Sequence, residues 1–180
     1  MTRGRRHGPP AAAAGDAEQA SRSRGYPHEY ALRLLTARSY TVRDLRRKLV
    51  QREYPPEEVA ATIERLERSG LLDDASYAER FARGKLVDER ASRRRVAQLL
   101  TRKGIAADLI AGAIARVVET EQVDNAVSIE KVARKKLQTL TGLDPRVVRQ
   151  RLFAFLARRG YELEDIKRTV ALLAKREWSK

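Results

Sequence analysis

The sequence predicts an all-α protein, built as an elongated array of three tandem three-helix repeats. From Pro27 onward, apolar residues recur every three or four positions, the spacing that lines one face of an α-helix. Glycine and proline mostly separate these segments, and one apolar pattern occurs three times. The periodic segments predict nine helices, at residues 28–38, 42–53, 56–69, 74–88, 92–103, 106–119, 124–139, 145–159 and 162–177.

Residues that favour helix starts stand at several of these boundaries. Thr41 with Asp44 resembles a capping box in which aspartate replaces glutamate. Pro56 suits a first helical position, where its missing N–H is not needed. Further N-cap candidates are Ser92 and Asp144, the latter followed by Pro145.

Glycines mark helix ends in the same way. Gly70, Gly104 and Gly160 each follow an apolar-periodic segment, where a left-handed residue commonly ends a helix. Glu53 stands in the first copy of the pattern where the other two copies have Gly104 and Gly160. We therefore expect the corresponding turn of the first repeat to be shaped differently. The adjacent carboxylates Asp73 and Asp74 suit either a helix cap or acid–base and metal chemistry, and their adjacency favours the cap.

The internal repeat places Leu49, Leu100 and Leu156 at equivalent points, 51 and 56 residues apart. Four further positions are apolar in all three copies when these offsets are applied without gaps. Each unit is too small to bury its apolar face well, so we expect neighbouring units to stack. The equivalent positions are Leu45, Val96 and Leu152; Tyr54, Ile105 and Tyr161; Val59, Ile110 and Ile166; and Ile63, Ile114 and Val170.

These patterns divide the chain into a tail and three repeats. The tail, residues 1–26, has no apolar period and is predicted to be disordered and basic. It is interpreted as a solvated leader, with a nucleic-acid-contacting arm as the alternative. The repeats are predicted at residues 27–73, 74–121 and 122–180, and the chain is expected to be a monomer.

Charge concentrates on the middle helix of each repeat. The chain has a formal net charge of +14, a balance typical of proteins that bind nucleic acid or an acidic protein groove. The middle helices contribute more positive charge than residues 27–180 as a whole, so the rest of residues 27–180 is slightly acidic. Either the arginines and lysines form solvated faces, or together they make a basic stripe that contacts phosphates or an acidic protein. The stripe comprises Arg43, Arg46, Arg47, Lys48, Arg93, Arg94, Arg95, Arg102, Lys103, Arg146, Arg149, Arg151, Arg158 and Arg159.

The composition argues against several function classes. The chain has no cysteine and two histidines, which excludes disulfides, thiolate metal sites and a multi-histidine centre. It contains no phosphate-binding glycine loop, no nucleophile elbow and no apolar run that approaches a membrane span. We therefore expect a cytoplasmic protein that is not an enzyme and carries no cofactor or metal.

Three motifs resemble the RecX family of bacterial regulatory proteins. The first begins at Thr41 and runs to Leu49 (TVRDLRRKL), the second is GLLDDASYA at 70–78, and the third is LTRKGI at 100–105. The resemblance covers residues 30–174. It implies tandem three-helix units and a non-enzymatic protein of DNA repair and recombination. Such a protein binds the RecA–single-stranded DNA filament and mostly inhibits its growth, ATPase and strand exchange.

One alternative remains open from the residues alone. The chain is then a stand-alone nucleic-acid-binding protein whose repeats act like helix-turn-helix units. The basic helices offer few Asn or Gln side chains for reading bases, and aromatic residues make up only 6% of the chain, which disfavours this alternative. In either case single-stranded DNA is an expected partner, directly and weakly or through the filament.

Overall fold

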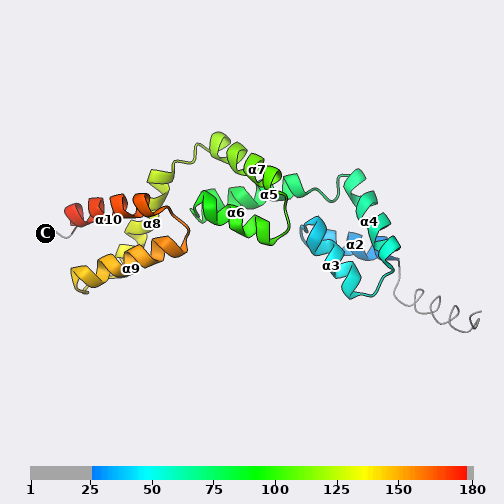
Figure 1. Cartoon of the computed structure of the whole chain (residues 1–180), viewed down its shortest axis with the longest axis horizontal. Helices are drawn as coiled ribbons and strands as arrows, with labels where there is room; N and C mark the ends of the chain where they lie inside the picture. The colour runs from blue at the N-terminus through cyan, green and yellow to red at the C-terminus, as the bar shows by residue number, and fades with distance from the viewer. Residues whose placement is uncertain (1–25, 178–180) are drawn as a thin grey trace, which may run out of the picture. The chain divides into compact units, whose positions relative to one another are not determined.

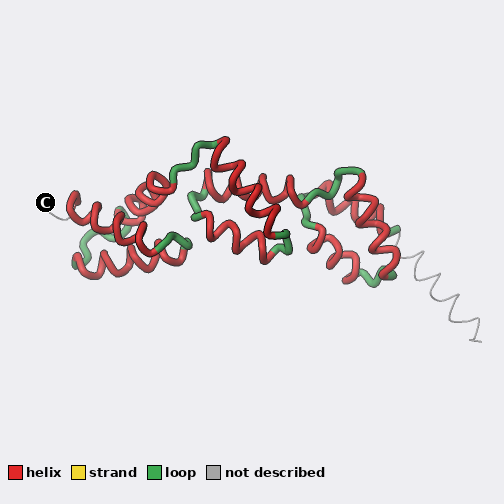
Figure 2. Tube along the Cα trace, turned by 45° about the horizontal axis from the view of Figure 1, so that its top comes forward, coloured by secondary structure: helices red, strands yellow, loops and turns green. Residues whose placement is uncertain are grey.

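A computed structural model describes residues 26–177, and these form helices and loops without a β-strand (Figures 1 and 2). The predicted tail, apart from Tyr26, and the last three residues of the third predicted repeat lie outside this range. The chain divides into two compact units, one up to Leu72 and one from Asp73. The repeat boundaries proposed from the sequence remain predictions.

The first unit is a three-helix bundle. Nine buried apolar residues, among them Leu45, Leu49 and Ile63, form its core. Thr41 caps the middle helix as predicted, because its side-chain oxygen accepts a hydrogen bond from the Asp44 N–H at 3.1 Å. The three helices are α2 (Pro27–Ala37), α3 (Val42–Gln51) and α4 (Pro56–Arg68).

The second unit contains two further helix triplets, each with its own core. One core centres on Val96 and Leu100, and the other on Leu152 and Leu156, all four fully buried. The first triplet is α5 (Asp74–Arg83) with a π-helical turn η1 (Gly84–Asp88), α6 (Arg93–Arg102) and α7 (Ala107–Thr120); the second is α8 (Asn125–Leu137), α9 (Pro145–Arg158) and α10 (Leu163–Glu177).

The predicted register of the repeats is confirmed. Fourteen of the fifteen equivalent apolar positions are buried, and the remaining one, Ile114, is partly buried against the core of its triplet. Each triplet buries its own set of apolar residues, so the expectation that a unit is too small to bury its own apolar face well is wrong. Three helices folded around a central pair of buried aliphatic residues are sufficient to enclose a small core of nine to twelve residues.

The expected difference at Glu53 is also wrong. Glu53 adopts the left-handed backbone conformation, with φ of 60°, as do Gly104 at 84° and Gly160 at 81°. In all three repeats the N–H of this residue donates to the carbonyl three residues earlier at 2.9 Å. The fold thus imposes the same turn on a residue with a side chain, although the left-handed conformation costs such a residue about 1–2 kcal/mol.

The predicted single helix over 74–88 is broken at Gly84. Beyond Gly84 the backbone widens into η1, in which the Glu89 N–H donates to the Gly84 carbonyl, five residues back, at 3.1 Å. Arg90 then turns the chain with a φ of 50°. Glycine weakens a regular helix at this point, and the apolar period alone does not distinguish an α-turn from a π-turn.

Asp73 caps α5, as the capping interpretation predicted. One carboxylate oxygen accepts hydrogen bonds from the N–H groups of Ala75 and Ser76, and the other accepts from the Ser76 hydroxyl at 2.6 Å. The hydrogen bonds from Ser76, with a smaller contribution from Ala75, hold the pKa of Asp73 below its ordinary value. Within residues 26–177, no group of three acidic or histidine side chains is placed to hold a metal ion.

Removal of this cap by Asp73→Ala is expected to cause a pH-dependent loss of stability. We expect the substitution to lower the free energy of unfolding by about 1 kcal/mol at pH 7. Because the pKa is depressed in the folded chain, the cap is at full strength above the unfolded value of about 3.9 and weakens as the pH falls through the lower folded value. Urea unfolding from pH 7 toward pH 3 measures the difference, with Asp73→Asn as a cap that does not titrate. A difference between wild type and Asp73→Ala that stays constant over this range contradicts the prediction.

Candidate functional site: a basic surface at the joint of two repeats

The predicted basic residues lie on the middle helices and the turns that follow them. Of the fourteen, ten are exposed, and Lys48, Arg95, Lys103 and Arg159 are half-buried. The four on α3 belong to the first unit. The other ten share the second unit, and we call them the basic surface of α6 and α9: Arg93, Arg94, Arg95, Arg102, Lys103, Arg146, Arg149, Arg151, Arg158 and Arg159.

The C-terminal end of α9 contacts the N-terminal end of α6, which brings Arg158 and Arg159 near Arg93, Arg94 and Arg95. The other five lie farther from this contact, at the opposite end of α6 or in the first half of α9. Ser92 is the centre of this joint. Its hydroxyl oxygen accepts the N–H of Arg95 at 3.1 Å, which caps α6 as predicted. The same hydroxyl donates to the Gly160 carbonyl at 2.6 Å, and the Arg159 carbonyl lies 3.1 Å away. One side chain therefore starts one basic helix and holds the end of the other.

Two further side chains complete the joint. The Arg159 guanidinium donates to the Glu89 carbonyl at 2.9 Å, and the Tyr161 hydroxyl donates to the Arg90 carbonyl. Both carbonyls follow η1, so the π-helical turn presents acceptors that a continued α-helix would use internally. Burial raises the pKa of Tyr161 above its ordinary value, partly offset by the nearby Arg159 and Arg90 charges.

The joint leaves no room for a side chain at Gly160. A Cβ placed there would lie 2.8 Å from the Ser92 hydroxyl oxygen and 3.1 Å from the Arg95 Cβ. An exposed ion pair between Arg94 and Glu162, at 3.7 Å, also joins the two repeats, and such pairs contribute little to stability. The sequence identified Ser92 as a cap and Gly160 as a helix end, but not their contact. The one sequence feature that could have indicated this contact is the glycine followed by an aromatic or branched residue after the middle helix.

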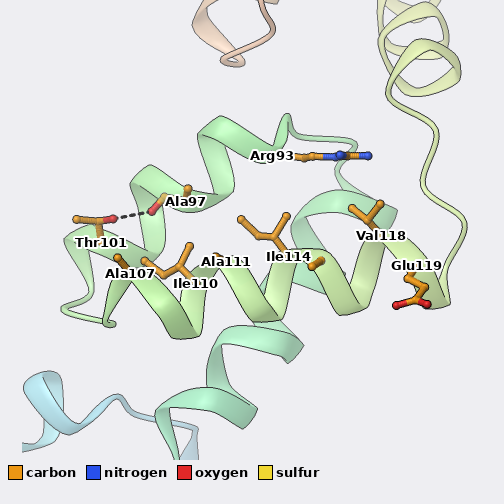
Figure 3. Close-up of a pocket in the computed structure, with 10 residues that line it drawn as sticks. Arg93, Ala97, Thr101, Ala107, Ile110, Ala111, Ile114, Val118 and Glu119 are labelled. Atoms are coloured by element: carbon orange, nitrogen blue, oxygen red, sulfur yellow. Dashed lines mark hydrogen bonds between the residues drawn. The ribbon is translucent and has the colours of Figure 1, made fainter.

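An apolar groove lies beside the basic surface, between α6 and α7 (Figure 3). Its volume is about 580 Å³, and alanines and β-branched residues from both helices line it. Ile110, Ile114 and Val118 line it from α7, with Arg93 and Glu119 also at its edge. Arg93, predicted only as a basic-stripe residue, thus also borders an apolar surface.

These features define a class of protein: tandem three-helix repeats with a basic surface where two repeats meet. Three family models match the chain in order: the first three-helix domain of RecX over residues 28–66, the second over 73–114 and the third over 124–170. The chain belongs to the RecX family of regulatory proteins.

Individual relatives agree with this assignment. The chain is 38% identical over 136 residues to the regulatory protein RecX of Mycobacterium sp. (strain KMS), covering 74% of each chain. It is 29% identical to the RecX of Pelodictyon phaeoclathratiforme, covering 80% of this chain and 86% of the relative. The crystal structure of RecX from Lactobacillus salivarius, 18% identical, shows the same fold with a TM-score of 0.68 over 87% of this chain and 97% of that one. A second RecX crystal structure, 23% identical, gives a TM-score of 0.71 over 88% and 76%.

These matches confirm the resemblance and the tandem arrangement of three-helix domains predicted from the sequence. No helix within the described range has the length and apolar character needed to cross a bilayer.

Proposed function

We propose that this chain is a non-enzymatic regulator that binds the RecA–single-stranded DNA filament and mostly inhibits its growth, ATPase and recombinase activity. The proposal places it in the cytoplasm, in DNA repair and recombination, as a monomer without a cofactor. Membership of the RecX family and the name of its relatives, regulatory protein RecX, support a regulatory role. RecA as the partner follows from the family resemblance.

The observation that carries the proposal is the joint between α9 and α6. The ten basic side chains of α6, α9 and the turns that follow them belong to two segments that meet at Ser92, and seven of the ten are exposed. A single basic helix is readily explained as a solvated face, but two that are held together by specific hydrogen bonds offer a larger surface of one sign. Such a surface suits filament phosphates or an acidic face of the recombinase, and it accelerates association with either.

Replacement of Arg93, Arg94 and Arg95 by alanine is expected to weaken filament binding without unfolding the protein. Arg93 and Arg94 are exposed, and Arg95→Ala retains the Cβ that borders Gly160. Exposed substitutions usually change stability by less than about 0.5 kcal/mol each. If these side chains contact phosphates, each lost contact reduces the salt slope of binding by about 0.7. If they contact recombinase instead, affinity for the filament falls while affinity for the bare strand is unchanged.

The experiment is a salt titration of the full chain against the filament and against the same bare single strand. The matched control removes three exposed basic side chains of α10, at Lys167, Arg168 and Lys175, which lie outside the basic surface. Unchanged filament affinity of the folded triple variant contradicts the role of these arginines. Equal wild-type affinity for filament and bare strand favours the stand-alone nucleic-acid-binding alternative.

A further inference from the structure

A second cavity of the second unit lies where α8, the end of α9 and the segment after η1 meet. Its volume is about 540 Å³, within the range of pockets that bind small ligands. Five basic and two acidic side chains line it, and three of the basic ones come from α8, which was not predicted as a basic helix. The basic members are Arg90, Lys131, Lys135, Lys136 and Arg159, and the acidic ones are Asp88 and Glu89.

One of the two acidic side chains in this cavity is already paired. Glu89 pairs with Lys85, which lies outside the lining, and its backbone carbonyl accepts the Arg159 guanidinium. In contrast, among the described residues Lys131 and Lys135 have neither an ion-pair partner nor a hydrogen-bond acceptor for their ammonium groups. Both side chains are exposed. The cavity therefore presents positive charge that its own walls do not neutralise.

Phe155 adds an aromatic wall. Its ring is half-buried, with the Lys136 ammonium 5.5 Å and the Arg159 guanidinium carbon 5.0 Å from the ring centroid. Aromatic surface beside cations is the combination by which proteins hold single strands, since unstacked bases contact the ring and phosphates contact the charges. A duplex hides its base faces and gains only the charges.

The cavity is continuous with the basic surface of α6 and α9, because Arg159 belongs to both. Lys131 and Lys135 are four residues apart on α8, so their side chains are neighbours on one helix face. Cations in a row can each contact one phosphate of a nucleic-acid strand. A free nucleotide is too compact to contact the whole row, so we favour the strand as the ligand.

We propose that this pocket is a binding subsite for single-stranded nucleic acid, in which Lys131, Lys135 and Lys136 contact backbone phosphates beside Phe155. The inference deepens the proposed function and rests on it for its biological role, since it assigns to the third repeat a direct contact with the strand. The binding itself is measurable without recombinase.

The test compares the full chain with Lys131→Gln/Lys135→Gln by fluorescence anisotropy of a labelled oligo(dT) strand. The two lysines are exposed, so we expect the variant to remain folded. Loss of two phosphate contacts is expected to weaken binding about tenfold or more at ~50 mM salt and to reduce the salt slope by about 1.4. Lys167→Gln/Lys175→Gln is the matched control, because it removes the same charge from exposed positions on α10; its affinity should change far less.

Three outcomes overturn the subsite. They are an unchanged oligo(dT) affinity in the pocket variant, an equal loss in the control, and a wild type that binds ATP, measured by calorimetry, more tightly than it binds the strand, with the ATP affinity lost in the pocket variant. A duplex of the same length bound as tightly as the strand, with the same loss in the variant, overturns the single-strand assignment. The proposed function fails separately. If the wild type has no effect on RecA but the pocket variant loses oligo(dT) binding, the subsite stands and the proposed regulatory function is rejected.

Discussion

Leu100→Asp unfolds the middle repeat. Leu100 is fully buried in α6, within the core that it shares with Val96 and Ile110. Loss of the leucine side chain alone costs about 2–5 kcal/mol, and an unpaired carboxylate in the same place adds several kcal/mol more. Since whole domains are stable by only about 5–15 kcal/mol, the helices α5 to α7 are expected to lose their protection against hydrogen exchange.

Gln98→Asp is the matched control for this substitution. Gln98 lies on the same helix, two residues away, and is exposed, so it introduces the same charge without burying it. We expect its circular dichroism and exchange to stay near those of wild type. A folded Leu100→Asp variant with native protection in α6 shows that the repeat does not depend on this core position.

Gly160→Ala is expected to open the joint between α9 and α6. The residue has a φ of +81°, and the added Cβ collides with the Ser92 hydroxyl and borders the Arg95 backbone nitrogen at 3.3 Å. The backbone conformation costs alanine about 1–2 kcal/mol. Displacement of the Ser92 hydroxyl from the Gly160 carbonyl adds about 1–2 kcal/mol, because the hydrogen bond is part-buried. The total loss in unfolding free energy is thus about 2–4 kcal/mol.

Gly142→Ala separates the two causes. Gly142 has nearly the same φ, +77°, and an added Cβ meets nothing within 4 Å. Urea unfolding of the full chain should show the conformational cost in both variants and the additional cost only at Gly160. Filament binding through the basic surface should fall in Gly160→Ala and not in Gly142→Ala. Equal losses of stability in the two variants show that the collision is relieved without opening the joint.

The sequence predicted the elements that local chemistry determines. The helical period and the internal repeat both predict that the leucines at 49, 100 and 156 lie in the core, and all three are fully buried. Helix caps are predictable because a capping residue acts on N–H groups only two or three positions away. The structure shows such caps at Thr41, Ser92, Asp73 and Asp144.

Features that depend on contacts between repeats were not predicted. The second role of Ser92 depends on the contact of α9 with α6, since its acceptors there lie 67 and 68 residues further along the chain. The widening of the backbone at η1 is a change of hydrogen-bonding pattern that the apolar period does not distinguish from an α-helix. The pocket lysines on α8 were missed for another reason. The net charge of a whole segment does not reveal the local excess at Lys131, Lys135 and Lys136, because acidic residues elsewhere in the same segment offset it.

The two hydrogen bonds of the Ser92 hydroxyl couple fraying of the α6 N-terminus to detachment of the α9 C-terminus. Fraying of the first turn of α6 removes the group that holds the Arg95 N–H, and that same group anchors the end of α9. The helix start therefore cannot open while the neighbouring repeat stays attached in its native way, and detachment of that repeat leaves the turn uncapped. Thermal fluctuations at this point are correlated across the two repeats, so their local opening behaves as one cooperative event rather than two independent ones.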